Sequence, residues 1–287
     1  MFEQEATGLR YLALVTDLLQ RARLASAEGG VWEAGDLQWS WRRDQHADPA
    51  NARFWLDEAE RSIGAVIVTE YPDVTGLDVI AMPDETELVR TELWPYAFDR
   101  MDRLRGLPIE VAVNDDDIAT ARLLANAGFV VVEPMAMSCW MSAAERAAVP
   151  KIASGYRLRS TAERPIDPHH MATRNGPHVA ERLKECSLYR PELDLYVEGP
   201  DGDIAGYALF WADPITSVGL LEPMRTEDRH QHKGLGTHLV RAGLERLVQH
   251  GCTRLKVTYL DDNEPARLLY VGSGFHPRTP SRTYRRT

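Results

Sequence analysis

The chain has 287 residues, of which 44% are hydrophobic and 26% charged, and its formal net charge is −10. This length exceeds the usual size of one compact core, so we expect two domains of roughly 140 residues each. The acidic balance argues against a nucleic-acid binder, because such binding depends on clustered Lys and Arg. It is compatible with a cationic or amine-bearing partner, and also with simple solubility.

The cysteines and the apolar runs also limit the class of protein. Cys139, Cys186 and Cys252 lie far apart with no C-x-x-C spacing, which predicts neither a zinc site nor a disulfide framework. We therefore expect no metal. The first twenty residues lack the pattern of a signal peptide, and no stretch approaches ~18 uninterrupted apolar residues. The expected location is the cytoplasm, without membrane association.

In the first half, apolar runs bounded by Pro and Gly predict strands. Residues 63–68 and 76–80 are interpreted as consecutive strands joined by a turn at 71–73. Residues 109–113 predict a further strand, and residues 118–126 predict the helix that follows it.

The second half repeats this arrangement. Residues 204–210 and 219–222 predict two strands, residues 255–259 a third, and residues 264–271 a helix that ends at Gly274-Phe275. The strands at 109 and 255 are 146 residues apart, as are the Gly-Phe pairs that begin at 128 and 274. A repeat of this length indicates one mixed α/β unit used twice.

The boundary between the repeats is expected near residues 146–155, where Pro150 breaks regular structure and an alternating strand restarts at 155–159. This places one domain at 1–148 and the other at 149–287. Each is expected to hold a central twisted mixed sheet flanked by helices.

The strongest signal is the loop Gln231-His232-Lys233-Gly234-Leu235-Gly236, which precedes an amphipathic helix over 235–250. Glycines let the backbone approach a ligand closely, and the N–H groups at a helix start attract phosphate. A P-loop would need Lys after its second glycine, whereas Lys233 comes before the first. A dinucleotide-binding fingerprint fails at Leu239, where its third glycine belongs.

The block Gln231-x-x-Gly234-x-Gly236 resembles the cofactor motif of the GNAT N-acetyltransferase superfamily. The block Asn263-x-x-Ala266-x-x-Leu269-Tyr270-x-x-x-Gly274-Phe275 is similar to that family's second motif. Two motifs in the right order are more specific than either alone. The resemblance covers roughly residues 155–286 and extends through the repeat to most of the first half, which gives a tandem GNAT protein.

The resemblance implies acetyl transfer from acetyl-CoA to an amine by direct attack in a ternary complex. It also implies two catalytic groups. Tyr270 would protonate the departing thiolate, and the repeat places Leu124 at the matching position of the first half. Glu222 is the leading candidate for the base, with Glu227, Asp228 or a relayed water as alternatives. The implied contacts to the cofactor come from Met224, Arg225, Thr226, Gln231, His232, Lys233, Gly234, Leu235, Gly236, Thr237 and Asn263.

The strand that leads into the loop carries Pro223, which predicts a bulge or an edge, because proline removes a ladder donor. Asn263 is also expected to cap the helix after it.

The first half departs from the family pattern. Its matching loop, residues 83–90, contains no glycine and carries three acids, which would repel a diphosphate. Asp117 stands where Asn263 stands in the second half. We therefore expect this half to be degenerate and to support the other half or contribute walls to the acceptor cleft. Four tryptophans near His46 predict either core packing or a pocket for an apolar or cationic acceptor: Trp32, Trp39, Trp41 and Trp55.

The expected acceptor is a small-molecule amine, such as an amino acid, a polyamine or an amine-bearing antibiotic. A tandem enzyme of the mycothiol-synthase type is a narrower option within the same resemblance. A non-catalytic acyl-CoA-binding regulatory or interaction protein is the alternative from another class. The sequence does not indicate the oligomeric state.

Overall fold

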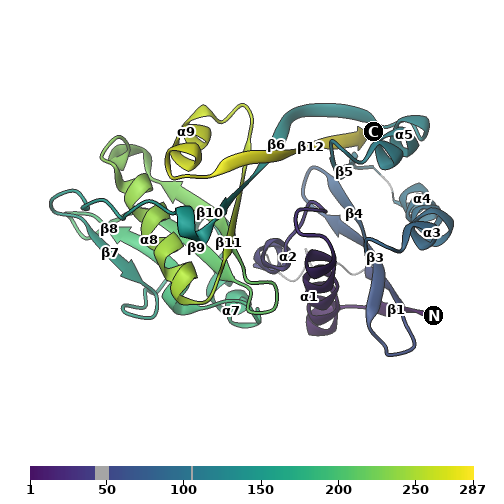
Figure 1. Cartoon of the computed structure of the whole chain (residues 1–287), viewed down its shortest axis with the longest axis horizontal. Helices are drawn as coiled ribbons and strands as arrows, with labels where there is room; N and C mark the ends of the chain where they lie inside the picture. Colours follow the sequence, from purple (N-terminus) through teal and green to yellow (C-terminus); the bar gives the residue numbers. More distant parts are fainter. Residues whose placement is uncertain (43–51, 105) are drawn as a thin grey trace. The chain divides into compact units, whose positions relative to one another are not determined.

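The structure is a computed structural model that describes residues 1–42, 52–104 and 106–287. Contacts divide the chain into two compact units (Figure 1). Unit 1 comprises Met1–Leu37, Asp44–Ala136 and Thr279–Thr287, and unit 2 comprises Gln38–Arg43 and Met137–Arg278. The domain boundary between residues 148 and 149 stays a prediction.

The first part of the chain alternates strands and helices, and it includes the elements predicted over residues 63–126. Its elements are β1 (Phe2–Ala6), α1 (Gly8–Ala25), α2 (Ala34–Ser40), β2 (Ala52–Leu56), β3 (Ser62–Glu70), β4 (Thr75–Ala81), α3 (Thr86–Leu88), the π-helical turn η2 (Val89–Leu93), α4 (Trp94–Arg103), β5 (Ile109–Asn114), α5 (Ile118–Asn126) and β6 (Val130–Ser142).

The second part has the same alternation. Its elements are the 3₁₀ turn η3 (Ala143–Glu145), β7 (Arg157–Ser160), α6 (Ala172–Asn175), α7 (Val179–Lys184), the 3₁₀ turn η4 (Pro191–Leu193), β8 (Asp194–Glu198), β9 (Ile204–Ala212), β10 (Val218–Thr226), the 3₁₀ turn η5 (Asp228–His230), α8 (Leu235–Gln249), β11 (Arg254–Leu260), α9 (Glu264–Gly272) and β12 (His276–Arg286).

The sheet is mixed, which confirms the predicted α/β class. The strand order is β1-β2-β3-β4-β5-β12 in the sheet of unit 1 and β6-β11-β10-β9-β8-β7 in the sheet of unit 2. Strands β4 and β5 are parallel, as are β10 and β11, whereas β9 pairs with β10 antiparallel. In both units, therefore, the helix-linked pair that the repeat predicts is parallel.

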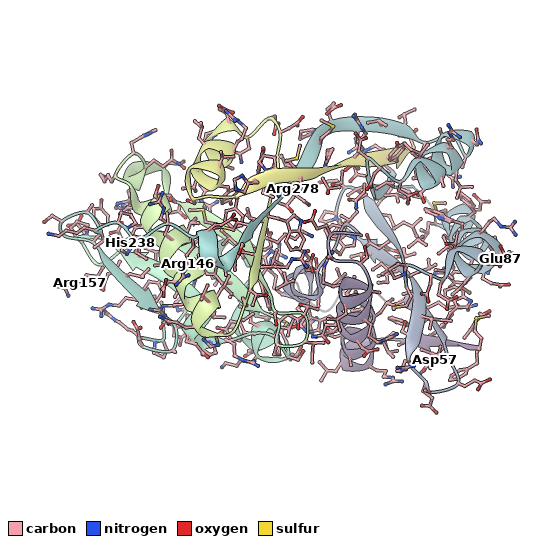
Figure 2. The ribbon with its side chains drawn as sticks, viewed as in Figure 1. Asp57, Glu87, Arg146, Arg157, His238 and Arg278 are labelled. Carbon is pink, nitrogen blue, oxygen red and sulfur yellow. The ribbon has the colours of Figure 1, made fainter. Side chains whose placement is uncertain are left out.

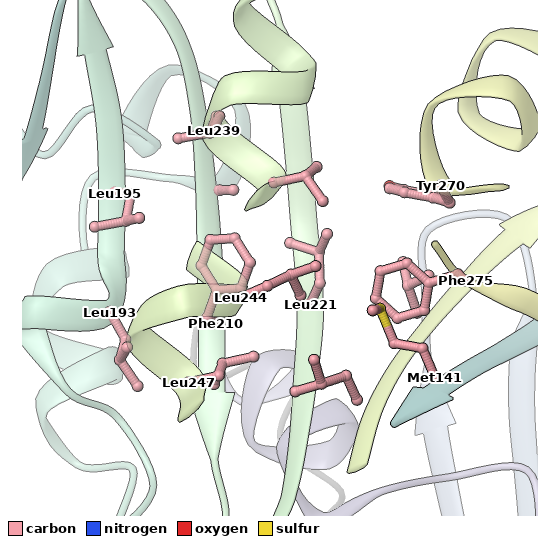
Figure 3. Packing of buried hydrophobic residues seen from close by; sticks show 14 of the residues in the cluster. Met141, Leu193, Leu195, Phe210, Leu221, Leu239, Leu244, Leu247, Tyr270 and Phe275 are labelled. Atoms are coloured by element: carbon pink, nitrogen blue, oxygen red, sulfur yellow. The ribbon is translucent and has the colours of Figure 1, made fainter. Parts of the chain in front are cut away.

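The core of unit 2 forms where α8 covers β8, β9 and β10 (Figure 3). The predicted stripe on α8 is buried, and Leu239, Leu244 and Leu247 belong to the same cluster as Phe210. Gly243 permits this packing, because a Cβ there would lie 1.9 Å from the Phe210 ring. The helix is thus held against the sheet at a distance that only glycine allows.

The sequence patterns did not predict strands β1, β2 and β8. Of the four tryptophans, Trp32 and Trp55 belong to unit 1, and Trp39 and Trp41 to unit 2. Trp39, Trp41 and Trp55 are buried in the cores. His46 lies outside the described residues. Among the residues described, no helix has the length and apolarity needed to cross a bilayer.

Candidate active site

Strands β10 and β11 pair along only part of their length. The parallel ladder runs from Val218↔Arg254 to Leu221↔Val257, although β10 continues to Thr226 and β11 to Leu260. The ladder of β10 with β9 shifts register between Leu221 and Met224, which confirms the bulge expected around Pro223. The two strands therefore stop pairing midway, and a gap in the backbone ladder opens beside the end of β10.

Helix α8 begins at this end of β10 with a glycine. Gly234 is its N-cap, with φ +73°, and it supplies no side-chain cap. The first N–H groups of a helix have no intrahelical partner, and the first turn of α8 contains no acid. A left-handed glycine without a side chain therefore leaves these donors available to an anion.

Gly236 lies against the end of β10 and against α9. A Cβ there would be 3.3 Å from Met224 Cε, 3.4 Å from Leu269 Cδ2 and 3.5 Å from Thr226 Oγ1. Three residues predicted to hold the cofactor (Met224, Thr226 and Gly236) are thus neighbours. A larger side chain at position 236 would therefore be in close contact with these three atoms.

Hydrogen bonds beneath the loop hold it in place. His230 is buried, and its Nδ1 lies 3.0 Å from Tyr156 Oη and its Nε2 2.8 Å from Asp203 Oδ2. The Gln231 amide donates to Thr226 O and to Asp228 Oδ1, both at 3.3 Å. Gln231 thus ties the loop to the end of β10. His230 and Tyr156 were not predicted, because the Tyr156 partner lies 74 residues away in the sequence.

The loop side chains Lys233 and His232 are exposed. Lys233 Nζ donates to Arg229 O at 2.9 Å, which bends this side chain back along the loop. His232 has φ +60°, so the loop contains two left-handed residues, at 232 and 234. Leu235 instead belongs to the core, and Thr237 lies in the first turn of α8.

Tyr270, on α9, is buried beside Phe275, with the ring centroids 6.3 Å apart (Figure 3). Its hydroxyl donates to Met224 Sδ at 4.0 Å, a weak acceptor at the end of β10. Burial raises the pKa of this hydroxyl, and the negative charge of Glu222 raises it further. The phenol therefore stays protonated at neutral pH and remains a proton donor.

Of the three candidate bases, Glu222 is half-buried on β10, and its carbonyl oxygen accepts from Trp211 Nε1 at 2.7 Å. The other two are engaged by arginines. Glu227 contacts Arg174 at 3.0 Å and Arg225 at 3.3 Å, and these ion pairs hold its pKa low despite partial burial. Arg225 also contacts Asp228 at 3.2 Å. A carboxylate that is paired with arginine is a weaker base.

Asn263 is the N-cap of α9, and its Oδ1 accepts from Ala266 N at 3.2 Å. The predicted cap is confirmed. Asp117 caps α5 in unit 1 in the same way, accepting from Thr120 N at 3.0 Å. The two residues at matching positions of the repeat thus share one structural role.

The corresponding helix start in unit 1 differs in charge and in shape. Helix α3 begins at Thr86 after Glu85, with Glu87 in its first turn, and continues as the π-helical turn η2. The exposed Glu87 lies at the periphery of unit 1 and pairs with Arg90 at 2.7 Å (Figure 2). Two acids therefore lie at the helix start in the segment that the repeat matches to the glycine loop of unit 2.

One further polar cluster lies in unit 2, at the start of β8. Asp194 is fully buried, and its Oδ2 accepts from Tyr189 at 2.8 Å and from His169 Nε2 at 2.9 Å. His170 Nε2 is 3.1 Å from Asp194 Oδ1. Among the described residues, these two histidines and the aspartate are the group whose side-chain atoms lie close enough to hold a metal. Both hydrogen bonds reach Oδ2, whereas Asp194 Oδ1 and the two ring nitrogens of His170 are buried without a hydrogen bond from the described residues.

The chain was compared with known proteins. Residues 156–275 match the sequence model described as the acetyltransferase (GNAT) family. No curated protein sequence matches the chain closely enough to count as a relative. Solved structures do match, including a tandem GNAT protein from the clavulanic acid biosynthesis pathway, with a TM-score of 0.69 at 16% identity over 99% of this chain and 98% of that one.

Two further structures are similar along their whole length. A GCN5-related N-acetyltransferase from Sphaerobacter thermophilus has a TM-score of 0.65 at 15% identity, covering 99% of this chain and 95% of the other. A GNAT-family acetyltransferase from Colwellia psychrerythraea has a TM-score of 0.63 at 12% identity and full coverage of both chains. At such identities these matches establish the fold.

The glycine-led helix, the interrupted parallel pair and the family match together define residues 156–275 as an acetyltransferase domain of the GNAT family. The chain as a whole has the fold of a tandem GNAT protein. Both conclusions confirm the resemblance predicted from the two motifs.

Proposed function

We propose that the chain is an acetyl-CoA-dependent N-acetyltransferase that acetylates a primary amine of a small molecule, with its site in residues 149–287. The main support is the end of the β10–β11 ladder at Leu221 and Val257, next to the glycine start of α8. In the described chain, β10 beyond Leu221 has no ladder to β11, and the first turn of α8, which has no side-chain cap, lies beside Met224 and Thr226. The family match of this half supports the same assignment.

The residues around α8 fit a diphosphate. Its first turn carries no acid, and Gly234 leaves open space where a side chain would otherwise stand. The backbone of 231–237 would hold the diphosphate, and the main chain of 224–226 the pantetheine arm, with Asn263 beside it. These contacts rely on N–H groups and on close backbone approach, which glycine permits.

The chemistry needs one acid and one base. Acetyl-CoA supplies the acyl group as a thioester. The C–N bond to the amine forms as the C–S bond breaks, so one proton must leave the amine and one must reach the sulfur. Tyr270 is proposed as the donor to the sulfur, because its hydroxyl is protonated at neutral pH and, in the described chain, donates to the weak acceptor Met224 Sδ. Glu222 is proposed to take the amine proton, directly or through a water.

The cofactor site is tested by binding of acetyl-CoA, measured by calorimetry. Gly236→Glu should abolish binding, because the new side chain brings bulk and negative charge to the start of α8. Gly272→Glu is the matched control, since it adds the same charge to α9 where a Cβ meets nothing within 4 Å. Equal binding by the wild type and the Gly236 variant would show that the diphosphate is held elsewhere.

The reaction is tested by release of free thiol from acetyl-CoA with a panel of amino acids, polyamines and aminoglycosides. For an accepted amine, Tyr270→Phe should lower kcat by about a hundredfold or more while the affinity for acetyl-CoA is kept. Tyr259→Phe, a change of the buried tyrosine next to it, should leave kcat almost unchanged. Binding of acetyl-CoA without thiol release for any amine would favour a non-catalytic acyl-CoA-binding protein.

A further inference from the structure

Unit 1 contains a cavity of about 450 Å³ that the proposed acetyl transfer does not use. Strands β4 and β5 are paired at Thr75↔Ile109 and Gly76↔Glu110, whereas β4 continues to Ala81 and β5 to Asn114. The cavity is lined by both strands beyond this pairing, by the end of α1 with the segment after it, and by the starts of α3 and α5. Its volume lies within the range of small-molecule sites.

Much of the cavity wall is apolar or aromatic. Side chains from four elements contribute: Leu19 on α1, Ile80 on β4, Val111 and Val113 on β5, and Trp94 at the start of α4. All five are buried in the folded chain. Trp32, from the segment after α1, adds a half-buried indole. Such a wall suits a ligand with an apolar body.

Apart from one arginine that is already paired with a glutamate, the ionisable groups of the cavity wall are acidic. Its one arginine, Arg23, is buried in a pair with Glu33, with Nε 2.9 Å from Oε2. The same guanidinium donates to the carbonyl oxygens of Ser26 at 3.1 Å and Ala27 at 3.0 Å. Its charge is therefore already balanced.

Three other charged residues line the cavity, and all are aspartates: Asp78, Asp116 and Asp117. Asp116 and Asp117 are exposed, and Asp117 caps α5. The described residues of the lining include no lysine or histidine. The cavity therefore has a negative lining, which excludes a diphosphate as its ligand and favours a cation.

Asp78 is the inner carboxylate of this cavity. Its Oδ1 accepts from Trp32 Nε1 at 2.9 Å, and this is the one hydrogen bond that the described chain gives to its side chain. Burial raises the pKa of Asp78 to about 6, and the bond from Trp32 only partly opposes this. A desolvated carboxylate that accepts one hydrogen bond from a neutral donor is stabilised when a cation lies close to it.

We propose that this cavity binds a small organic cation, an ammonium group on an apolar body, with the ammonium at Asp78 and Trp32. The carboxylate supplies the charge, and the indole beside it adds a face that attracts cations. The apolar body then packs against Ile80, Val111 and Trp94. The proposal is independent of acetyl transfer, because every residue in it belongs to unit 1.

Phenethylammonium is a suitable probe, and 2-phenylethanol is its neutral counterpart of the same size. Binding to the full chain is measured by calorimetry at pH 7.5. Phenethylammonium should bind at least about tenfold more tightly than the alcohol, since a charge-assisted bond to a partly desolvated carboxylate exceeds a neutral one. Asp78→Asn keeps the acceptor for Trp32 and should bring the two affinities level.

Two variants locate the binding. Glu87→Gln removes an equal charge from an exposed side chain outside the cavity lining and should leave the affinity unchanged. Gly236→Glu alters only the cofactor site of unit 2 and should also leave it unchanged, so failure of the proposed acetyl transfer does not affect this test. The proposal is overturned if both probes bind equally, if neither binds at millimolar concentration, or if Asp78→Asn keeps the preference for the cation.

Discussion

The substitution Asp78→Asn gives a stability prediction with a defined dependence on pH. Asp78 has a pKa of about 6 in the folded chain, against an ordinary value of 3.8, because burial disfavours its charge. The folded chain therefore holds a proton over the pH range in which the unfolded chain has lost it. Asparagine keeps the acceptor for Trp32 and has no charge to bury.

The pKa difference fixes the sign and size of the effect. Between pH 3.8 and pH 6 the folded state binds more protons than the unfolded state, so the free energy of unfolding falls as the pH rises. The two pKa values correspond to about 3 kcal/mol in total, of which about half is lost between pH 5 and pH 8. The Asn variant lacks this loss. Its stability relative to the wild type should therefore increase by about 1.5 kcal/mol from pH 5 to pH 8.

The assay is urea denaturation of the wild type and the variant at both pH values, without ligand. Glu87→Gln serves as control, because an exposed carboxylate should give a difference that stays nearly constant with pH. The reasoning is refuted if the Asp78 variant gains no stability relative to the wild type between pH 5 and pH 8. It is also refuted if the difference changes in the opposite direction.

Three further predictions concern the core, a helix cap and a buried carboxylate. Gly243→Ala should destabilise unit 2 by about 3 kcal/mol or more, seen as a lower melting temperature, because the new Cβ would lie 1.9 Å from Phe210; an unchanged melting temperature would contradict the close packing. Asn263→Ala should cost about 1 kcal/mol in urea denaturation by removing the cap bond to Ala266, whereas Asn263→Asp should retain it. Asp194→Asn should lower the stability at pH 7 by about 2 kcal/mol. Burial opposes ionisation of Asp194, but its histidine donors hold the pKa at about 2. The wild type should therefore lose this stability as the pH falls from about 4 to 2. If the free energy of unfolding fell equally with pH in both proteins, the assignment would be contradicted.

Sequence patterns predicted the elements whose signals are local. The 146-residue repeat located β5 with α5 and β11 with α9, since strand composition, a capping Asn or Asp and a closing Gly all lie within about twenty residues. The apolar stripe and the glycine before it located α8 with an error of one residue at its end.

Strand β8 shows why other elements were missed. Its sequence, Asp194 to Glu198, has an acid at each end, which is unusual for a buried strand. Asp194 is tolerated because Tyr189 and His169 donate to it, and His169 comes from a segment 25 residues earlier. Such partners are set by tertiary packing and leave no periodic signal.

In the candidate site, too, the parts with a local sequence signal were predicted and the parts set by tertiary packing were not. The glycine loop and Tyr270 were found from motifs, but the support beneath the loop was not. His230 is held by Tyr156 and Asp203, which come from different parts of the chain. The cavity at Asp78 was also missed, because its lining comes from seven elements and the segment after α1, which no single pattern joins.

The last nine residues of the chain have a consequence for dividing the protein. Residues 279–287 belong to unit 1, and β12 pairs with β5 from Ser281↔Asn114 to Arg286↔Ile109. A fragment that stops at residue 148 would leave β5 with an open edge, and unpaired edges invite aggregation. The two repeats follow one another in the sequence, but the end of the second repeat completes the sheet of unit 1. Neither half can then be released intact by a single cut.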